Sequence, residues 1–274
     1  MKVFLSFSPW RVLLLSVFLF SLSAPAAGHS EDKSLVYAPM PAGEIARLQR
    51  RVSALPVGER IAFWAESFIG APYDTDPLGA YVRSRRAVCD NRVDCMYLVF
   101  RAVELATSDT PRGAVERALT LRFRTRGIIK DGVIVNYDDR YAYAEDMVFS
   151  GKWGENITGR LGHIRDVPGT RGRARITYLP RDELLKPGNY ARLRSGDLVF
   201  FVKDPARRVA GEVVGHLGVI RMKDGRPFLI HASGSKSSPG HAGGGVVKEV
   251  DLPGYLSGMS FIGVMVTRFP NKSR

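Results

Sequence analysis

The chain has 274 residues, of which 45% are hydrophobic, which is enough to bury a core and argues against a disordered chain. Its 40 Lys and Arg residues outnumber its 27 Asp and Glu residues, so the formal net charge is +13. Such a surface favours anionic partners, such as nucleic acid, anionic lipid or carboxylate-bearing peptides. Arginines that only keep the protein soluble would give the same charge.

The first residues have the pattern of a secretory signal peptide. Lys2 and Arg11 flank its start, residues 12–22 are almost wholly apolar, and Ala24-Pro25-Ala26 offers a small-residue cleavage site. The apolar run is too short to span a bilayer, although an uncleaved anchor is the alternative. We therefore expect residues 1–26 to be removed and the mature protein to be exported to the periplasm or cell envelope. We expect no stable membrane anchor and no nucleic-acid partner.

The chain contains two cysteines, Cys89 and Cys95, six positions apart. Neither lies near Ala26, so a lipid anchor on a mature N-terminal cysteine is excluded. In an oxidising compartment the two could form a disulfide. Such a bridge would tie down the Cys95 thiol, so we favour free thiols.

Helices are expected before and at the second cysteine. Residues 27–58 form a polar lead-in and a helix, and a second amphipathic helix over 61–70 ends at Gly70, as expected of a C-terminal cap. Cys95 then begins a third helix, with Asp94 as its cap. The positive end of that helix dipole favours thiolate, the nucleophilic form of cysteine. A buried, inert cysteine is the alternative.

The middle of the chain is harder to interpret. Residues 121–123 and 132–136 resemble short strands joined by an Asp131-Gly132 turn. Residues 137–146 are dense in aromatic and charged side chains, which suits a sugar or peptide groove and suits a polar surface patch nearly as well. Residues 169–175 form a loop rich in Gly and Arg.

The last third of the chain is rich in strands. The expected strands cover residues 198–202, 215–222, 227–233, 246–250 and 261–269. If Asp224-Gly225 is a two-residue hairpin turn, counting outward places Gly218 opposite His231. His216 then lies on the same face of the sheet, with its Cβ atom within roughly 7–8 Å of that of His231.

A nucleophilic cysteine needs a base and a group that orients the base. His216 and His231 could fill these two roles for Cys95. The alternatives are two histidines with separate structural roles, or a zinc site made by all three side chains. The short-spaced ligand pairs typical of zinc sites are absent from the sequence, so we expect no metal and no cofactor.

The order of these motifs resembles the NlpC/P60 superfamily of papain-like cell-wall hydrolases. The motifs are Phe68-Ile69-Gly70-Ala71-Pro72-Tyr73, Asp94-Cys95, Gly196-Asp197-Leu198-Val199-Phe200-Phe201, Gly215-His216-Leu217-Gly218-Val219-Ile220 and Ile230-His231-Ala232-Ser233. The insert with Asp139-Arg140-Tyr141, Trp153 and Asn156-Ile157-Thr158 resembles the N-acetylmuramoyl-L-alanine amidase-like branch, the DUF1460 group. Met96 and Tyr97 depart from that branch, in which small hydroxyl residues usually follow the cysteine.

The resemblance implies an α+β fold with a papain-like core, in which N-terminal helices and the nucleophile-bearing helix pack on an antiparallel sheet. Residues 59–270 would form this domain, with the insert at about 120–180. The implied catalytic residues are Cys95 as nucleophile, His216 as general base and His231 as the orienting residue. The expected oxyanion and substrate-binding residues are Tyr73, Asp94, Arg140 and Tyr141.

The resemblance further implies a peptidoglycan hydrolase that cleaves the amide between N-acetylmuramic acid and L-alanine. One alternative is an endopeptidase that cuts between D-glutamate and the diamino acid of stem peptides. Another is a non-catalytic module that binds the cell wall through its basic surface and aromatic insert. The expected partner is peptidoglycan or a muropeptide, and we expect a monomer.

Overall fold

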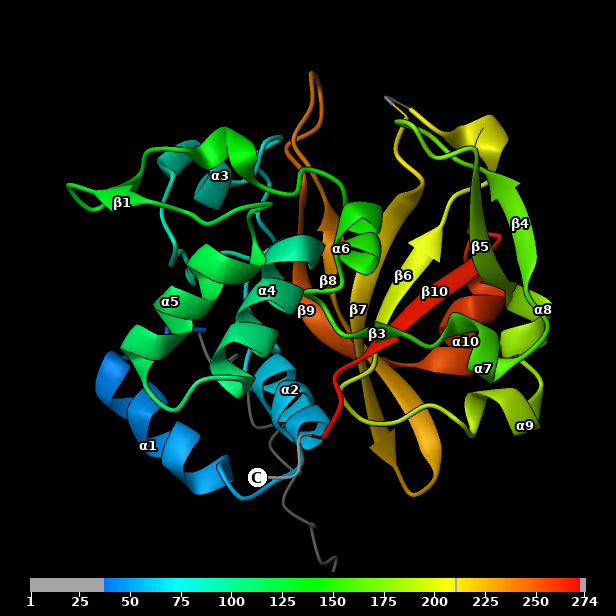
Figure 1. The fold of residues 1–274 in the computed structure, drawn as a ribbon, viewed down its shortest axis with the longest axis horizontal. Helices are drawn as coiled ribbons and strands as arrows, with labels where there is room; N and C mark the ends of the chain where they lie inside the picture. The colour runs from blue at the N-terminus through cyan, green and yellow to red at the C-terminus, as the bar shows by residue number, and fades with distance from the viewer. Residues whose placement is uncertain (1–36, 210, 272–274) are drawn as a thin grey trace, which may run out of the picture. The chain divides into compact units, whose positions relative to one another are not determined.

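The computed structural model describes residues 37–209 and 211–271 of the chain. The expected signal peptide, residues 1–26, lies outside these described residues. Within them, no helix is long and apolar enough to cross a membrane. The described chain combines helices with an antiparallel sheet (Figure 1), which confirms the predicted α+β class.

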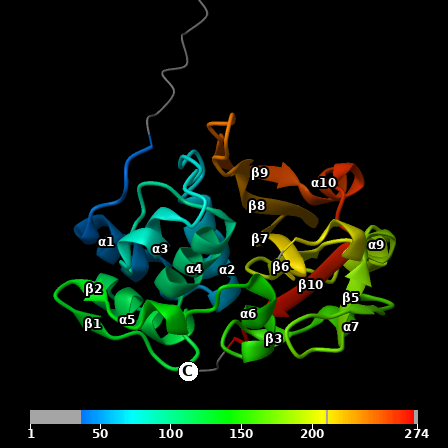
Figure 2. The ribbon, with the colours of Figure 1, turned by 90° about the horizontal axis from the view of Figure 1, so that it is seen from above.

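Within the described residues, five helices precede the first strand and lie together beside the sheet (Figures 1 and 2). They are α1 (Ala42–Val52), α2 (Val57–Glu66), α3 (Ala80–Ser84), α4 (Cys95–Ala106) and α5 (Pro111–Leu121). Asp94 caps α4 by accepting the Tyr97 N–H, and Thr110 caps α5 by accepting the Gly113 N–H. Because α4 packs against α2, α5 and the sheet, every residue from Tyr97 to Ala106 is buried.

The first helix shares the core of the domain that the sequence analysis begins at residue 59. Ile45 and Leu48 of α1 are buried in the same hydrophobic cluster as α4. The Gln49 amide donates to the carbonyl oxygens of Leu105 and Ser108, at distances of 3.4 and 3.1 Å. The helical layer therefore starts at α1.

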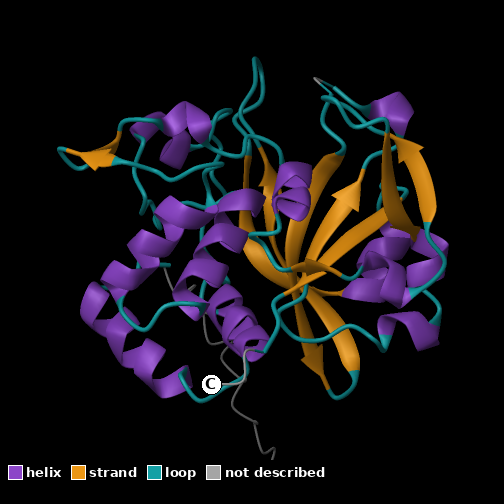
Figure 3. Ribbon diagram, in the orientation of Figure 1, coloured by secondary structure: helices purple, strands orange, loops and turns teal. Residues whose placement is uncertain are grey.

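In the part of the chain that the structure describes, eight strands form one sheet, and its neighbouring strands are all antiparallel. They are β3 (Glu155–Asn156), β4 (Arg165–Pro168), β5 (Arg175–Pro180), β6 (Leu198–Val202), β7 (Val214–Lys223), β8 (Arg226–Ser235), β9 (Gly244–Asp251) and β10 (Gly263–Arg268). The order across the sheet is β4-β5-β10-β6-β7-β8-β9, and β3 pairs with β10. Figure 3 shows that the strands of this sheet gather on one side of the domain, and helices α1 to α5 lie on the other side together with the short β1–β2 hairpin.

The two faces of the sheet bury different side chains, because residues alternate between faces along a strand. Leu217, Val219 and Ile230 belong to the cluster that includes α4. Phe201 and Ile220 belong to a second cluster with α10 (Leu252–Gly258), which the sequence analysis did not predict. The histidine-bearing strands β7 and β8 are thus fixed from both sides.

The remaining elements are short. They are β1 (Ile129–Lys130), β2 (Val133–Ile134), α6 (Ala144–Ser150), α7 (Thr158–Leu161), α8 (Arg181–Leu184), α9 (Pro187–Tyr190) and the 3₁₀ turns η1 (Tyr137–Asp139) and η2 (Pro205–Arg207). The predicted Asp131-Gly132 turn is confirmed, since both residues have positive φ and join β1 to β2.

One local prediction in this region is wrong, and one is confirmed. The strand expected over residues 121–123 does not form, because Thr110 and Pro111 start a helix that runs to Leu121. The predicted Gly- and Arg-rich loop is confirmed over residues 169–174, where it joins β4 to β5 in an antiparallel hairpin.

The predicted register of the β7–β8 hairpin is confirmed. Lys223 pairs with Arg226, and Ile220 pairs with Leu229, on either side of the Asp224-Gly225 turn. A one-residue slip would have turned His231 to the opposite face. The observed register instead brings it to the same face as His216.

Candidate active site

Cys95 lies at the point where α4 meets β7. It is the first residue of α4, and the backbone N–H groups of Met96 and Leu217 both point to its sulfur. Leu217 directly follows His216 on β7. The helix start therefore holds the sulfur beside the strand that carries the expected base, and the residue stays partly exposed.

The structure corrects the expected ionisation of Cys95. Burial and the Asp94 carboxylate raise the pKa of the thiol to about 12, although the two backbone N–H groups act in the opposite direction. Desolvation outweighs the helix dipole because the sulfur is crowded by protein atoms. At neutral pH the free site therefore holds a thiol, and proton transfer must accompany attack.

The two histidines form a contacting pair. His216 Nε2 lies 2.8 Å from His231 Nδ1, and the ring planes are nearly perpendicular, at 83°. His231 is only 2% exposed. Burial is the main cause that holds the pKa of both imidazoles well below the ordinary 6.5; the second cause is His231 for the His216 ring and the Lys248 cation for the His231 ring. Both rings are therefore neutral at neutral pH and can accept protons.

Aromatic side chains that the sequence analysis missed enclose the histidine pair. Phe201 stacks on His216 with ring centroids 5.7 Å apart, and Tyr255 of α10 meets the edge of His231 at 4.9 Å. Burial and the Cys95 charge raise the pKa of Tyr255 to about 12, so its hydroxyl stays protonated. The missed signal was Asp251 followed by Pro253, a cap and a first-turn proline that begin α10.

Tyr73 lies against the end of β8 and the start of β9. Its N–H donates to the Gly245 carbonyl at 2.8 Å, and a Cβ on Gly234 would overlap its ring, so glycine is required there. Burial and the nearby Cys95 and Asp94 raise the pKa of its hydroxyl. The structure thus brings Tyr73 and Asp94 to the same site as Cys95.

Comparison with known proteins shows which fold this is. Neither a family model nor a curated protein matches the chain. An N-acetylmuramoyl-L-alanine amidase from Bacteroides uniformis superposes with a TM-score of 0.58 and 19% identity, over 77% of this chain and 98% of that one. A Legionella pneumophila protein with the DUF1460 family model gives 0.62 and 15%, over 84% and 95%. The chain has the fold of these proteins.

A third structure limits what the likeness means. A Bacteroides fragilis protein named provisionally as a xylanase has a TM-score of 0.55 and 19% identity, over 76% of this chain and 100% of that one. The three structures carry different names at low identity. The likeness therefore establishes the amidase-like fold, and the activity has to be argued from the site.

Aromatic side chains of the insert at residues 137–146 pack into the interior of the protein. Tyr137 and Tyr141 are buried, and Glu145 accepts the backbone N–H groups of Val213 and Val214, which ties α6 to the start of β7. Among the contacts of the described residues, Arg140 bonds and stacks with Tyr137, and none joins Arg140 or Tyr141 to the cysteine or the histidines. The role of these two residues in substrate binding therefore stays a prediction.

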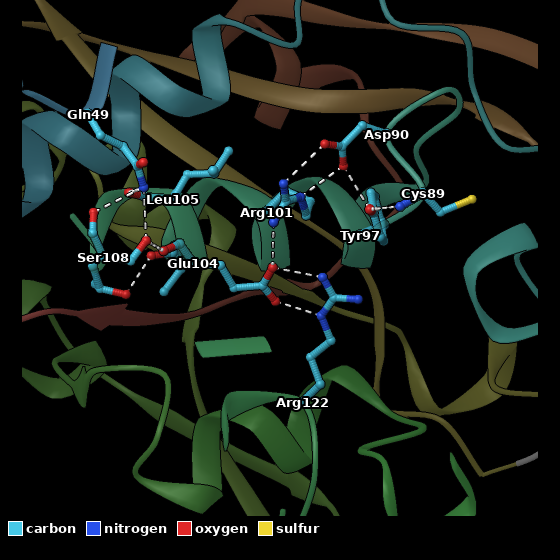
Figure 4. Close-up of polar contacts among 11 residues, drawn as sticks. Gln49, Cys89, Asp90, Tyr97, Arg101, Glu104, Leu105, Ser108 and Arg122 are labelled. Atoms are coloured by element: carbon cyan, nitrogen blue, oxygen red, sulfur yellow. Dashed lines mark hydrogen bonds and ion pairs between the residues drawn. The ribbon is translucent and has the colours of Figure 1, made fainter. Parts of the chain in front are cut away.

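A buried ion network lies behind the nucleophile helix (Figure 4). Arg101 binds Asp90 at 2.8 Å, and Glu104 binds both Arg101 and Arg122, at 3.2 and 2.6 Å. The Tyr97 hydroxyl donates to the same Asp90 at 2.7 Å. This explains the departure noted at Tyr97, because its side chain points to the back of α4 and anchors the preceding loop.

The arrangement suits covalent catalysis better than metal binding. Two ring nitrogens aim at each other across 2.8 Å, so they cannot both face one shared ion. Within the described part of the chain, no group of three or more His, Cys, Asp or Glu residues could hold a metal ion. Both Cys89 and Cys95 are free thiols. The site thus presents a free thiol and two neutral imidazole rings in contact with each other.

Proposed function

We propose that this protein is a cysteine-dependent peptidoglycan hydrolase of the NlpC/P60 superfamily, in its DUF1460 branch, with a papain-like core. Its reaction would be cleavage of the amide between N-acetylmuramic acid and L-alanine. The observation that carries the proposal is the Cys95 sulfur at the Leu217 N–H, one residue from a histidine pair in contact. The likeness to an amidase of known fold favours this substrate.

In the first half of the proposed reaction, the Cys95 sulfur attacks the lactyl carbonyl carbon. The thiol proton moves to His216 as the sulfur–carbon bond forms, because neither group is charged beforehand. Backbone N–H groups at the start of α4, with Tyr73, stabilise the oxyanion. His216 then returns the proton to the L-alanine nitrogen, which leaves as an amine.

In the second half, water hydrolyses the thioester. His216 takes a proton from the water as its oxygen attacks the same carbonyl carbon, and the thiolate leaves and recovers that proton. The products are the lactyl carboxylate and free Cys95. His231 keeps the base oriented throughout through the Nε2–Nδ1 contact.

Digestion of purified sacculi tests the proposal directly. The wild type should release intact stem peptides with a free L-alanine amine and leave lactyl-bearing glycan strands, as judged by mass spectrometry. Cys95→Ala should release nothing while its circular dichroism spectrum is unchanged, and Cys89→Ala is the matched control that should remain active. Hydrolysis retained by Cys95→Ala would refute the assignment.

The same digest separates the alternatives. Shortened stems that end in D-glutamate would mean an endopeptidase acting between D-glutamate and the diamino acid. Sacculus binding that Cys95→Ala leaves unchanged, with no fragments from the wild type, would mean a binding module. Release of reducing sugar from xylan would favour the name of the Bacteroides fragilis structure.

The proposed substrate lies outside the cytoplasmic membrane, so we also propose export through the leader at residues 1–26. Mass spectrometry of the protein recovered from a bacterial periplasm should give an N-terminus after Ala26. A monomer is the proposed form, and light scattering checks it.

A further inference from the structure

Lys236 is a cation at the nucleophile helix that the sequence analysis did not assign. Its Nζ lies 3.0 Å from Asp94 Oδ2 and 5.4 Å from the centroid of the Tyr73 ring. The Lys236 side chain is 30% exposed, while that of Asp94 is 10% exposed. Lys236 therefore joins the loop after β8 to the residue that caps α4.

The loop that carries Lys236 is held against the segment that contains Thr75 (Figure 1). The Ser237 N–H donates to the Thr75 carbonyl at 2.8 Å. The Ser235 hydroxyl lies 2.8 Å from His241 Nε2, which closes the loop. These contacts fix the loop, and the fixed loop keeps the Lys236 ammonium next to the Asp94 carboxylate.

Lys236 and Asp94 act on the Cys95 sulfur with opposite signs. Asp94 raises the pKa of the thiol, and Lys236 lowers it. Other ionisable groups face the same site. They are Tyr73, Asp74, Tyr81, His216, His231, Lys248 and Tyr255. Among the charges that act on Cys95, Lys236 is the ammonium that lowers the pKa of the thiol, and Asp94 is the carboxylate bonded to it.

We propose that Lys236 is a positioning residue that compensates the charge of Asp94 and thereby lets the Cys95 sulfur lose its proton during attack. Asp94 is needed as a helix cap, since its Oδ1 accepts the Tyr97 N–H at 2.8 Å. Its negative charge, however, opposes a second negative charge on the adjacent residue. The lysine allows one carboxylate to cap the helix without suppressing the nucleophile.

Charge compensation can be told apart from a purely structural latch by the sign of the effect. A latch predicts that Lys236→Met and Asp94→Asn both loosen the loop and act alike. Compensation predicts opposite effects, because one variant leaves an unbalanced anion and the other an unbalanced cation. Asn caps helices about as well as Asp, so Asp94→Asn keeps the helix start intact.

The readout is the rate at which iodoacetamide alkylates Cys95 at fixed pH 8, which follows the thiolate fraction. A Cys89→Ser background removes the other thiol. A shift of about one pKa unit, typical of a partly exposed neighbouring charge, changes the rate about tenfold. Lys236→Met should be about tenfold slower and Asp94→Asn about tenfold faster, and the double variant should be close to the starting rate.

Two controls complete the experiment. Lys236→Arg should restore the rate, and Lys223→Met, which removes a lysine paired with Glu249 elsewhere on the sheet, should leave it unchanged. Equal or same-direction changes in Lys236→Met and Asp94→Asn would overturn the proposal. If Lys236→Met does not fold, an Asp94→Asn rate that is unchanged or slower would overturn it equally.

The inference rests on the proposed function for its meaning, but its test does not require turnover. Opposite alkylation shifts in a protein that releases no muropeptides would sustain charge compensation and sink the amidase proposal. Normal muropeptide release without alkylation shifts would support the amidase proposal and overturn charge compensation. In the active protein, kcat/KM should fall in Lys236→Met and recover in Lys236→Arg.

Discussion

His216 Nε2 and His231 Nδ1 lie 2.8 Å apart, and this contact fixes how protons are arranged in the site. Two neutral rings in contact share one proton between these atoms. With that proton on His216 Nε2, its Nδ1 is free to accept the thiol proton. The other nitrogen of His231, Nε2, is buried without a hydrogen-bond partner among the described residues, so His231 has no second polar contact to compete for its orientation.

Replacing His231 should therefore lower kcat without abolishing binding. We expect His231→Ala to reduce kcat about 10²-fold, within the usual range for general acid–base contributions, because His216 loses its acceptor and its preferred tautomer. His231→Asn, which keeps an acceptor, should lose less. Steady-state kinetics on a soluble muropeptide check this, and an unchanged kcat in His231→Ala would remove His231 from the mechanism.

A plot of kcat/KM against pH should not show the fall near pH 6.5 that protonation of a catalytic histidine usually causes. The pKa of His216 is lowered from 6.5, so the base stays unprotonated as the pH falls through 6.5. The pKa of Cys95 is about 12, so the thiol does not ionise below pH 10. We expect kcat/KM to vary less than about threefold between pH 5 and 9. Half-loss of activity near pH 6.5, with the protein still folded, would contradict these shifts.

The buried network behind α4 should dominate stability at that helix. Glu104 lies between Arg101 and Arg122, and all three side chains are at most 3% exposed. Glu104→Gln leaves two buried cations with one carboxylate, so the free energy of unfolding should fall by about 3–5 kcal/mol. Urea unfolding measures this.

The matched control for that variant is Glu116→Gln. Glu116 forms an ion pair with Arg126, but both side chains are more than half exposed. Removing the charge there should change the free energy of unfolding by less than about 1 kcal/mol. Equal losses in the two variants would mean that burial does not govern these pairs.

The histidine pair could be predicted from the sequence because the register of a hairpin depends on residues that are close together in the chain. The Asp224-Gly225 turn sets the register, and the register alone decides that His216 and His231 share a face. The start of α4 was predictable for the same reason, since Asp94 caps the helix through a residue three positions away.

The sequence failed where the answer depends on contacts between distant segments. Whether the Cys95 sulfur is ionised depends on crowding by β7 and on Lys236, which is 141 positions further along the chain than Cys95. The helix dipole alone predicts a lowered pKa for the Cys95 thiol, whereas the pKa is raised. Likewise, Arg140 and Tyr141 looked like groove residues, but only packing shows that Tyr141 faces the core.

Phe201 and Tyr255 form an aromatic wall beside the histidine pair. Tyr255 packs its ring edge against His231 at 4.9 Å and also contacts Phe201 at 5.4 Å, so the ring rather than the hydroxyl should hold the histidines in place. Tyr255→Phe should keep kcat within about threefold, whereas Tyr255→Ala should lower it about tenfold or more by freeing the His231 ring. Histidine proton resonances provide the structural readout, and they should broaden only in Tyr255→Ala. Equal losses in both variants would instead assign a role to the hydroxyl, and no loss in either would show that the histidine contact holds without this wall.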